Sequence, residues 1–309
     1  MGRRYSGLWR GRGIIGAALV VLVLLPGCSA LRLGYGQLPT LAYWWLDGYV
    51  GFDAAQGRRV RDELRRWTDW HRSTQLQVYA AHLARVRAQA AGPVTGPQLC
   101  RLSEATRDLL DPAVERMLPA AAAIAATLGP AQIDSIDARY RRRTDEMRED
   151  MLQRDPLERR KAAAQRAVER FESFYGRLAD EQRRLVEDGL GASPFDAPAW
   201  FAQREQRHRE MLETMRAIAR EALPAEQAQE RLRRVVRRYD GRSPVGPPEQ
   251  AAAIAAHNCE LAARVHNSAS PAQRRHLADK LASWEADLRA LATPAAADAL
   301  RDAAFPSRP

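Results

Sequence analysis

The sequence predicts an all-α protein, an irregular bundle of about ten helices that follows a signal peptide and a short tether. The chain has 309 residues, of which 46% are hydrophobic and 28% charged, which is enough apolar material for a packed core. Aromatic residues make up only 7%, and runs of alternating β-branched residues with hairpin turns are missing from the sequence. Apolar residues instead step by three and four, as on one face of a helix, in stripes that include Ile133–Met151, Ala164–Leu178 and Leu277–Leu291.

The first element is a signal peptide over residues 1–27. Four arginines precede Ile14–Leu25, which are twelve residues without a charge. Such a run is about half of what a membrane-spanning helix needs, and no later segment approaches that length. Removing this segment leaves 44 basic and 38 acidic residues, or +6, which is a weak signal for nucleic acid.

The leader ends in Leu25-Pro26-Gly27-Cys28, which resembles the lipobox of bacterial lipoproteins. The resemblance implies cleavage between Gly27 and Cys28. It also implies that Cys28 then carries a diacylglycerol group and a further acyl chain, such as palmitate. Several acyl chains hold a protein at a membrane without a spanning helix. Ser29 in place of Asp favours, by the same resemblance, the periplasmic face of the outer membrane, the alternative being the periplasmic leaflet of the inner membrane.

Residues 28–42 contain glycines, Pro39 and few charges, and they are typical of a lipid-anchored tether. A helical body over residues 43–309 is expected to follow. It opens with an aromatic cluster, Tyr43, Trp44, Trp45, Tyr49 and Phe52. This cluster is a candidate surface for a partner or for the membrane interface, with burial in the bundle as the favoured alternative.

Helix starts recur along the body. Asp53 and Asp196 are N-cap residues, and a capping position followed three residues later by Gln recurs at Gln56, Gln98, Gln132, Gln182 and Gln273. These starts have no fixed period. The segment 54–90 changes its apolar face along its length, which predicts a bend or a change of neighbours. Residues 243–248, rich in proline, form the longest predicted loop and an alternative subdivision of the body.

Two cysteines remain after Cys28, and in an oxidising compartment we expect Cys100 and Cys259 to form a disulfide. Two unpaired thiols are the alternative. The six histidines fit no metal-ligand spacing, so we expect neither a metal nor any cofactor beyond the lipid on Cys28. Catalytic motifs such as GxSxG, SxxK and the Walker loop do not occur, and His208 lies on an apolar stripe typical of a core histidine.

The YWWLD segment, Trp67–Arg72 (WxxWHR), Cys100 after Pro97-Gln98 and Ser193–Asp196 (SPFD) together resemble a family of uncharacterised proteobacterial lipoproteins. That resemblance covers nearly the whole mature chain and carries no catalytic residues. Leu128-Gly129-Pro130-Ala131-Gln132 is more weakly similar to the LTxxQ helix starts of small periplasmic chaperones.

We therefore expect a non-enzymatic binding or structural lipoprotein that is held at the membrane by its anchor. Its expected partners are envelope proteins or lipids, and not nucleic acid. A periplasmic helical chaperone is the first alternative. A helical hydrolase or lyase acting on cell-wall or lipid substrates is the second. The sequence does not indicate the oligomeric state.

Overall fold

The computed structural model describes residues 30–153, 155–221, 223–238 and 248–293. All regular structure in these ranges is α-helical, which confirms the predicted fold class. Twelve helices are described: α2 (Ala30–Gly36), α3 (Leu38–Val50), α4 (Ala54–Thr74), α5 (Leu76–Gln89), α6 (Gly96–Ala125), α7 (Pro130–Met151), α8 (Pro156–Tyr175), α9 (Asp180–Gly191), α10 (Ala197–Glu221), α11 (Ala225–Arg238), α12 (Pro248–Asn267) and α13 (Pro271–Leu291).

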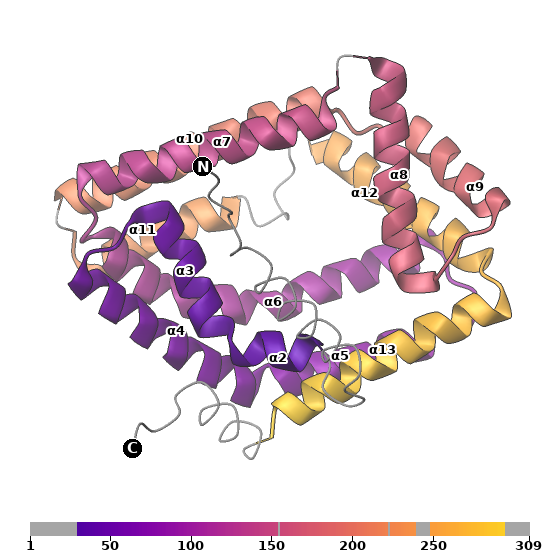
Figure 1. Cartoon of the computed structure of the whole chain (residues 1–309), viewed down its shortest axis with the longest axis horizontal. Helices are drawn as coiled ribbons and strands as arrows, with labels where there is room; N and C mark the ends of the chain where they lie inside the picture. The colour runs from indigo at the N-terminus through magenta and orange to yellow at the C-terminus, as the bar shows by residue number, and fades with distance from the viewer. Residues whose placement is uncertain (1–29, 154, 222, 239–247, 294–309) are drawn as a thin grey trace, which may run out of the picture.

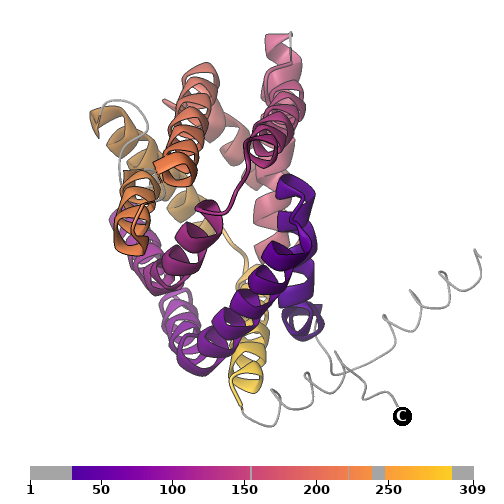
Figure 2. The ribbon, with the colours of Figure 1, turned by 90° about the vertical axis from the view of Figure 1, so that its left-hand side faces the viewer.

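The long helix α6 crosses the middle of the molecule in Figure 1, with α7 and α10 above it, α4, α5 and α13 below it, and α8 and α9 to the right. The side view of Figure 2 also places α13, in yellow, beside the helices of the lower edge. Helix α12 packs along α6, and α11 packs against α6 as well. The apolar core is divided into four clusters, so the protein is a set of connected helix layers without a single central core.

The predicted tether over 28–42 differs from the structure, in which residues 30–42 are helical and packed. Arg32 Nε lies 2.7 Å from the buried carboxylate of Asp287 on α13. The Tyr35 hydroxyl lies 2.8 Å from His71 Nδ1 on α4. The polar partners of residues 30–42 lie far away in sequence. The segment itself, which has few charges, therefore does not indicate that it packs on the body. The predicted change along 54–90 occurs at Gln75, between α4 and α5.

The alternative subdivision of the body was expected near residues 243–248. Residues 243–247 lie outside the described ranges, and α12 begins at Pro248. Beyond it, α12 packs on α6 and α13 packs on α5. The C-terminal helices are therefore part of the same packed body as the N-terminal ones.

Two groups of helices repeat one arrangement. The first module consists of α3, α4, α6 and α7, and the second of α8, α9, α12 and α13. In each module the first helix packs on the second and the fourth, and the second packs on the third. Helix α5 is inserted into the first module and packs on α13 of the second, whereas α10 and α11 are inserted into the second module and α10 packs on α7 of the first.

A glutamine clasp closes each module, and in the first it joins Gln56 to Gln132. The side-chain oxygens of both residues accept from the backbone N–H of their own N-cap residues. Their Nε2 groups donate outward, that of Gln56 to the carbonyl of Thr127 at 2.8 Å and that of Gln132 to the carbonyl of Gly51 at 2.9 Å. Gln132 Nε2 also lies 2.7 Å from Gln56 Oε1.

The second clasp, between Gln182 and Gln273, has the same connections. Gln182 Nε2 donates to the carbonyl of Ser268 at 3.1 Å, and Gln273 Nε2 donates to the carbonyl of Arg177 at 2.9 Å. The two Gln side chains meet at 2.8 Å. Each clasp satisfies backbone groups at two helix junctions at once, so it fixes where four helices meet.

Candidate functional site

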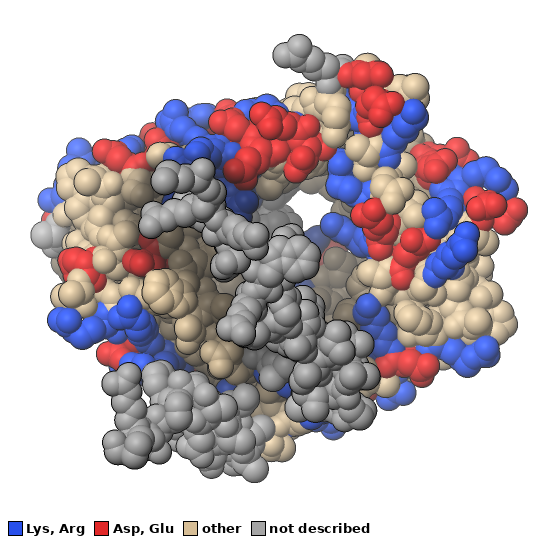
Figure 3. Space-filling view, viewed as in Figure 1, with Lys and Arg blue, Asp and Glu red and all other residues tan. Residues whose placement is uncertain are grey.

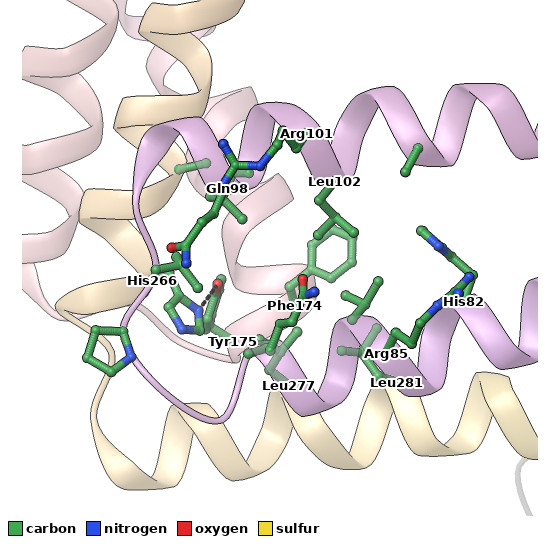
Figure 4. A pocket seen from close by; sticks show the side chains of 18 of the residues that line it. His82, Arg85, Gln98, Arg101, Leu102, Phe174, Tyr175, His266, Leu277 and Leu281 are labelled. Carbon is green, nitrogen blue, oxygen red and sulfur yellow. Dashed lines mark hydrogen bonds between the residues drawn. The ribbon is translucent and has the colours of Figure 1, made fainter.

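A cavity of about 870 Å³ lies between α5, α6, α8, α12 and α13. We call it the α5–α13 pocket. Sites for small molecules are typically concave, about 300–1,000 Å³ and mostly apolar. The side chains of Figure 4 come from both modules, so the pocket forms only when the modules pack together.

The walls of the pocket are apolar and come from all five helices. Leu277 and Leu281 of α13 are buried, and Phe174 of α8 lies between the α6 and α5 sides in Figure 4. Other apolar lining residues are Val86, Ala90, Pro93, Val94, Leu99, Leu102, Ala105, Phe171 and Ala262. Such a lining favours the removal of a hydrocarbon group from water.

Two buried histidines lie in the lining, and their hydrogen bonds fix them in place. His266 Nε2 lies 2.9 Å from the carbonyl of Gly92, which can only accept, so Nε2 carries the proton. In the neutral ring Nδ1 then accepts from the Tyr175 hydroxyl at 2.9 Å. Burial lowers the pKa of His266 and raises that of Tyr175 to about 12, so both stay neutral near pH 7.

His82 is the second of these histidines. Its Nε2 lies 2.9 Å from the Thr106 hydroxyl. Burial, followed by the nearby charge of Arg85, lowers the pKa of His82. It therefore adds a polar but uncharged group to the α5 side of the pocket near pH 7.

The only charged groups among the described residues that line the pocket are two exposed arginines, Arg85 and Arg101. Gln98 lies on the same wall as Arg101 (Figure 4). Its oxygen caps α6 by accepting from the Thr95 N–H at 2.7 Å. Of the five predicted helix starts with Gln three residues after the capping position, Gln98 is the one that takes no part in a clasp within the described structure. Its amide nitrogen remains on the pocket side.

A disulfide between Cys100 and Cys259 ties α6 to α12 beside the pocket, with the two Cα atoms 5.5 Å apart. Cys100 stands between Leu99 and Arg101, which both line the pocket. Gly96 permits the close approach of the two helices, because a Cβ there would collide with Glu260. The bridge therefore holds one wall of the pocket in register with the other module.

A second, smaller cavity of about 290 Å³ lies between α7 and α10, and His208 in its lining is paired with a carboxylate of α7. His208 Nε2 lies 2.9 Å from Asp137 Oδ1, which also accepts from Arg141 at 2.8 Å. The hydrogen bond from Arg141 lowers the pKa of Asp137, and burial lowers that of His208. The ring of Tyr140 stacks on His208 at 3.7 Å. These contacts explain His208 as a packed, hydrogen-bonded histidine, as its apolar stripe indicated.

The structure divides the aromatic cluster, for which burial was favoured and an exposed surface was the alternative. Tyr43 is buried under the Arg61 guanidinium, so it does not belong to an exposed surface. Trp44 and Trp45 are 64% and 60% exposed, and Tyr49 is half-buried against Trp45. Gly27 and Cys28 lie outside the described residues.

The WxxWHR stretch serves packing. Trp67 donates to the carbonyl of Ala113 at 3.0 Å and stacks on His71, which meets Tyr35. Most of the basic run 231–238 is paired, and Arg233 and Arg237 both reach Glu115 of α6. Basic and acidic side chains alternate over much of the visible surface in Figure 3, which also shows an opening below α7 and α10, beside α8.

Sequence reasoning missed the pocket because its lining comes from five helices. The helix start at Gln98 was recognised in the sequence, but only the structure shows that it lies beside the pocket and outside the clasps. Within the described ranges, neither a helix long and apolar enough to cross a membrane nor a group of three or more metal-ligating side chains is found.

Comparison with known proteins identifies a family and no function. A search of curated proteins finds no match, and neither does a search of solved structures. The model of a family of unknown function, DUF6279, matches residues 48–239, which is more than half of the chain and runs from the last turn of α3 through α4–α11. The chain belongs to this family.

Proposed function

We propose that the protein is a lipid-anchored binding protein of the cell envelope, at the periplasmic face of the outer membrane, that acts without covalent chemistry. The observation that carries the binding function is the α5–α13 pocket, with apolar walls, a few fixed polar groups and no carboxylate among its described lining residues. The lipobox-like Leu25–Cys28 supports the anchor.

The binding proposal is tested with an uncharged fluorescent probe, N-phenylnaphthylamine, whose emission rises in apolar surroundings. Ala105 is exposed and lines the pocket, so Ala105→Trp is expected to fill part of it and to weaken probe binding about tenfold. Ala121, exposed on the same helix and outside the pocket lining, gives the matched control Ala121→Trp, which keeps the affinity of the native chain. Equal affinities for the two variants would exclude the pocket as the binding site.

The anchor is tested by labelling cells with radioactive palmitate and by mass spectrometry of the purified product. We expect an acylated Cys28 at the new N-terminus, and no label in the Cys28→Ala variant. A product that begins at Met1 without lipid would contradict the proposal. Separation of the inner and outer membranes then decides between the two locations.

We assign the exposed Trp44 and Trp45, near the anchored end of the sequence, to the membrane interface, where Trp is enriched. Brominated lipids in a bilayer that carries the anchored protein are expected to quench part of its Trp emission. The variant Trp44→Ser/Trp45→Ser should lose that quenching, whereas Trp284→Phe, on α13, should keep it. Quenching that survives the double substitution would contradict the assignment.

A chaperone function is the second candidate, favoured by helix starts that approximate LTxxQ and by the opening in Figure 3. It predicts that the protein suppresses the aggregation of a reduced model substrate, such as lysozyme. Absence of suppression at several-fold molar excess would eliminate this candidate and leave the pocket proposal unaffected.

A further inference from the structure

We propose that the α5–α13 pocket takes an anionic amphiphile with a single hydrocarbon chain, such as a fatty acid or a lysophosphatidic acid. This inference rests on the proposed binding function and adds the chemical class of the ligand. The hydrocarbon chain would lie among Leu102, Phe174, Leu277 and Leu281, and the anionic head would lie at the rim, at Arg101 on the α6 side or at Arg85 on the α5 side.

The charge of the rim is the first argument. Arg85 and Arg101 make no ion pair with any described residue, although most arginines of α7 and α11 are paired with nearby carboxylates. The rim therefore has two guanidinium groups without a carboxylate to neutralise them. Guanidinium groups bind carboxylate and phosphate oxygens in short, charge-assisted hydrogen bonds.

The neutral state of the buried polar groups is the second argument. His82 and His266 have lowered pKa values and are uncharged near pH 7, and the Tyr175 hydroxyl is used by His266. Positive charge is thus confined to the exposed rim while the deeper lining is neutral and apolar. An amphiphile has the same division between a charged end and an apolar end.

The third argument concerns the amide of Gln98. In both clasps the corresponding Nε2 group donates to a carbonyl across the module, whereas Gln98 Nε2 has no hydrogen-bond partner among the described residues and lies on the wall that carries Arg101. It adds a neutral donor to the rim, suited to an oxyanion.

The test uses the full chain in phosphatidylcholine nanodiscs and three photoactivatable probes of equal chain length: diazirine-bearing palmitic acid, hexadecanol and hexadecylammonium. We expect palmitic acid to label peptides of α5, α6, α8 and α13 most strongly, and hexadecylammonium most weakly. Diazirine-bearing lysophosphatidic acid, as a fourth probe, distinguishes a fatty acid from a phosphate-headed lipid as the preferred source of the anion.

The variant Arg85→Gln/Arg101→Gln is expected to weaken labelling by palmitic acid about tenfold and to leave hexadecanol labelling unchanged. Arg58→Gln/Arg107→Gln, two exposed arginines outside the pocket lining, is the matched control and should label like the native chain. Urea unfolding of all variants identifies any that fail to fold.

The outcomes separate the two proposals. Equal labelling of the pocket by palmitic acid and hexadecanol, unchanged in the Arg85→Gln/Arg101→Gln variant, would overturn the anionic preference and leave the binding function standing. If no probe labels the pocket in the native chain, both the anionic preference and the binding function are overturned.

Discussion

The two modules share one scaffold but differ in the cavity beside their last helix. Beside α13, which packs on α5, there is a pocket of about 870 Å³ whose lining is completed by α6, α8 and α12, whereas between α7 and α10 the cavity is about 290 Å³ and the Tyr140 ring stacks on His208. Leu281 and Tyr140 each stand eight residues after the clasp glutamine of their helix. The interface around α13 is hollow where five helices come together, whereas the interface between α7 and α10 is filled by a stacked pair of rings.

The disulfide is the covalent link between the modules, and its removal should have the largest effect. It joins residues 159 apart in sequence, so we expect Cys100→Ser/Cys259→Ser to lower the free energy of unfolding by about 3 kcal/mol in urea denaturation. Reduced native protein should behave like the variant. If reduction leaves the urea midpoint unchanged, the packing of α6 on α12 alone holds the modules together.

The clasps should matter next, and equally in the two modules. Gln56→Ala and Gln182→Ala each remove a buried side chain, take one of two acceptors from the partner amide and leave a backbone carbonyl without its side-chain donor, which should cost about 2 kcal/mol of unfolding free energy. Gln98→Ala, which loses only a capping interaction, should cost less than about 1 kcal/mol. A loss in Gln98→Ala as large as in the other two would show that the clasp adds nothing to capping.

Enlarging one side chain should distinguish the hollow interface from the filled one. Leu277 and Ile136 both follow the clasp glutamine by four residues; Leu277 lines the pocket and Ile136 packs in a core cluster. We expect Leu277→Phe to be close to neutral in thermal unfolding because the pocket has room for the ring. Ile136→Phe should cost about 1–3 kcal/mol from overpacking. Equal costs would mean that the pocket closes in solution.

The smallest expected effect is on the pH dependence of stability. Burial lowers the pKa values of His266 and His208, so the unfolded chain binds protons more readily, and stability should fall as the pH drops below about 6.5. Asp137 partly offsets this for His208. We therefore expect His266→Gln to flatten the slope of unfolding free energy between pH 7 and pH 5 more than His208→Gln does. The reverse order, in urea titrations at each pH, would contradict this.

Much of the fold could be predicted because it depends on local patterns. The stripe Ile133–Met151 became α7, and the capping residues Asp53, Thr95 and Ser270 accept from the first-turn N–H groups of their helices, as expected. The predicted bundle of about ten helices agrees with the twelve that are described, and the predicted tether adds α2 and the start of α3. Those helices depend on contacts with α4 and α13 that no local pattern contains.

The repeat could not be found from sequence because its inserts differ. One helix separates α4 from α6, but two separate α9 from α12, so the clasped glutamines are 76 residues apart in the first module and 91 in the second. The recurring helix starts were visible, whereas their pairing was not. Pairing depends on which helix ends meet in space.

The sequence by itself determined the all-helical class and half of the described helix starts, because helix periodicity and capping are properties of neighbouring residues. Only the tertiary structure decided that Cys100 meets Cys259, that four of five similar glutamines pair, and that α5 and α13 leave a pocket with two unpaired arginines at its rim. The physical reason is that cavities and pairings arise where packing surfaces from distant segments fail or succeed in filling the space between them.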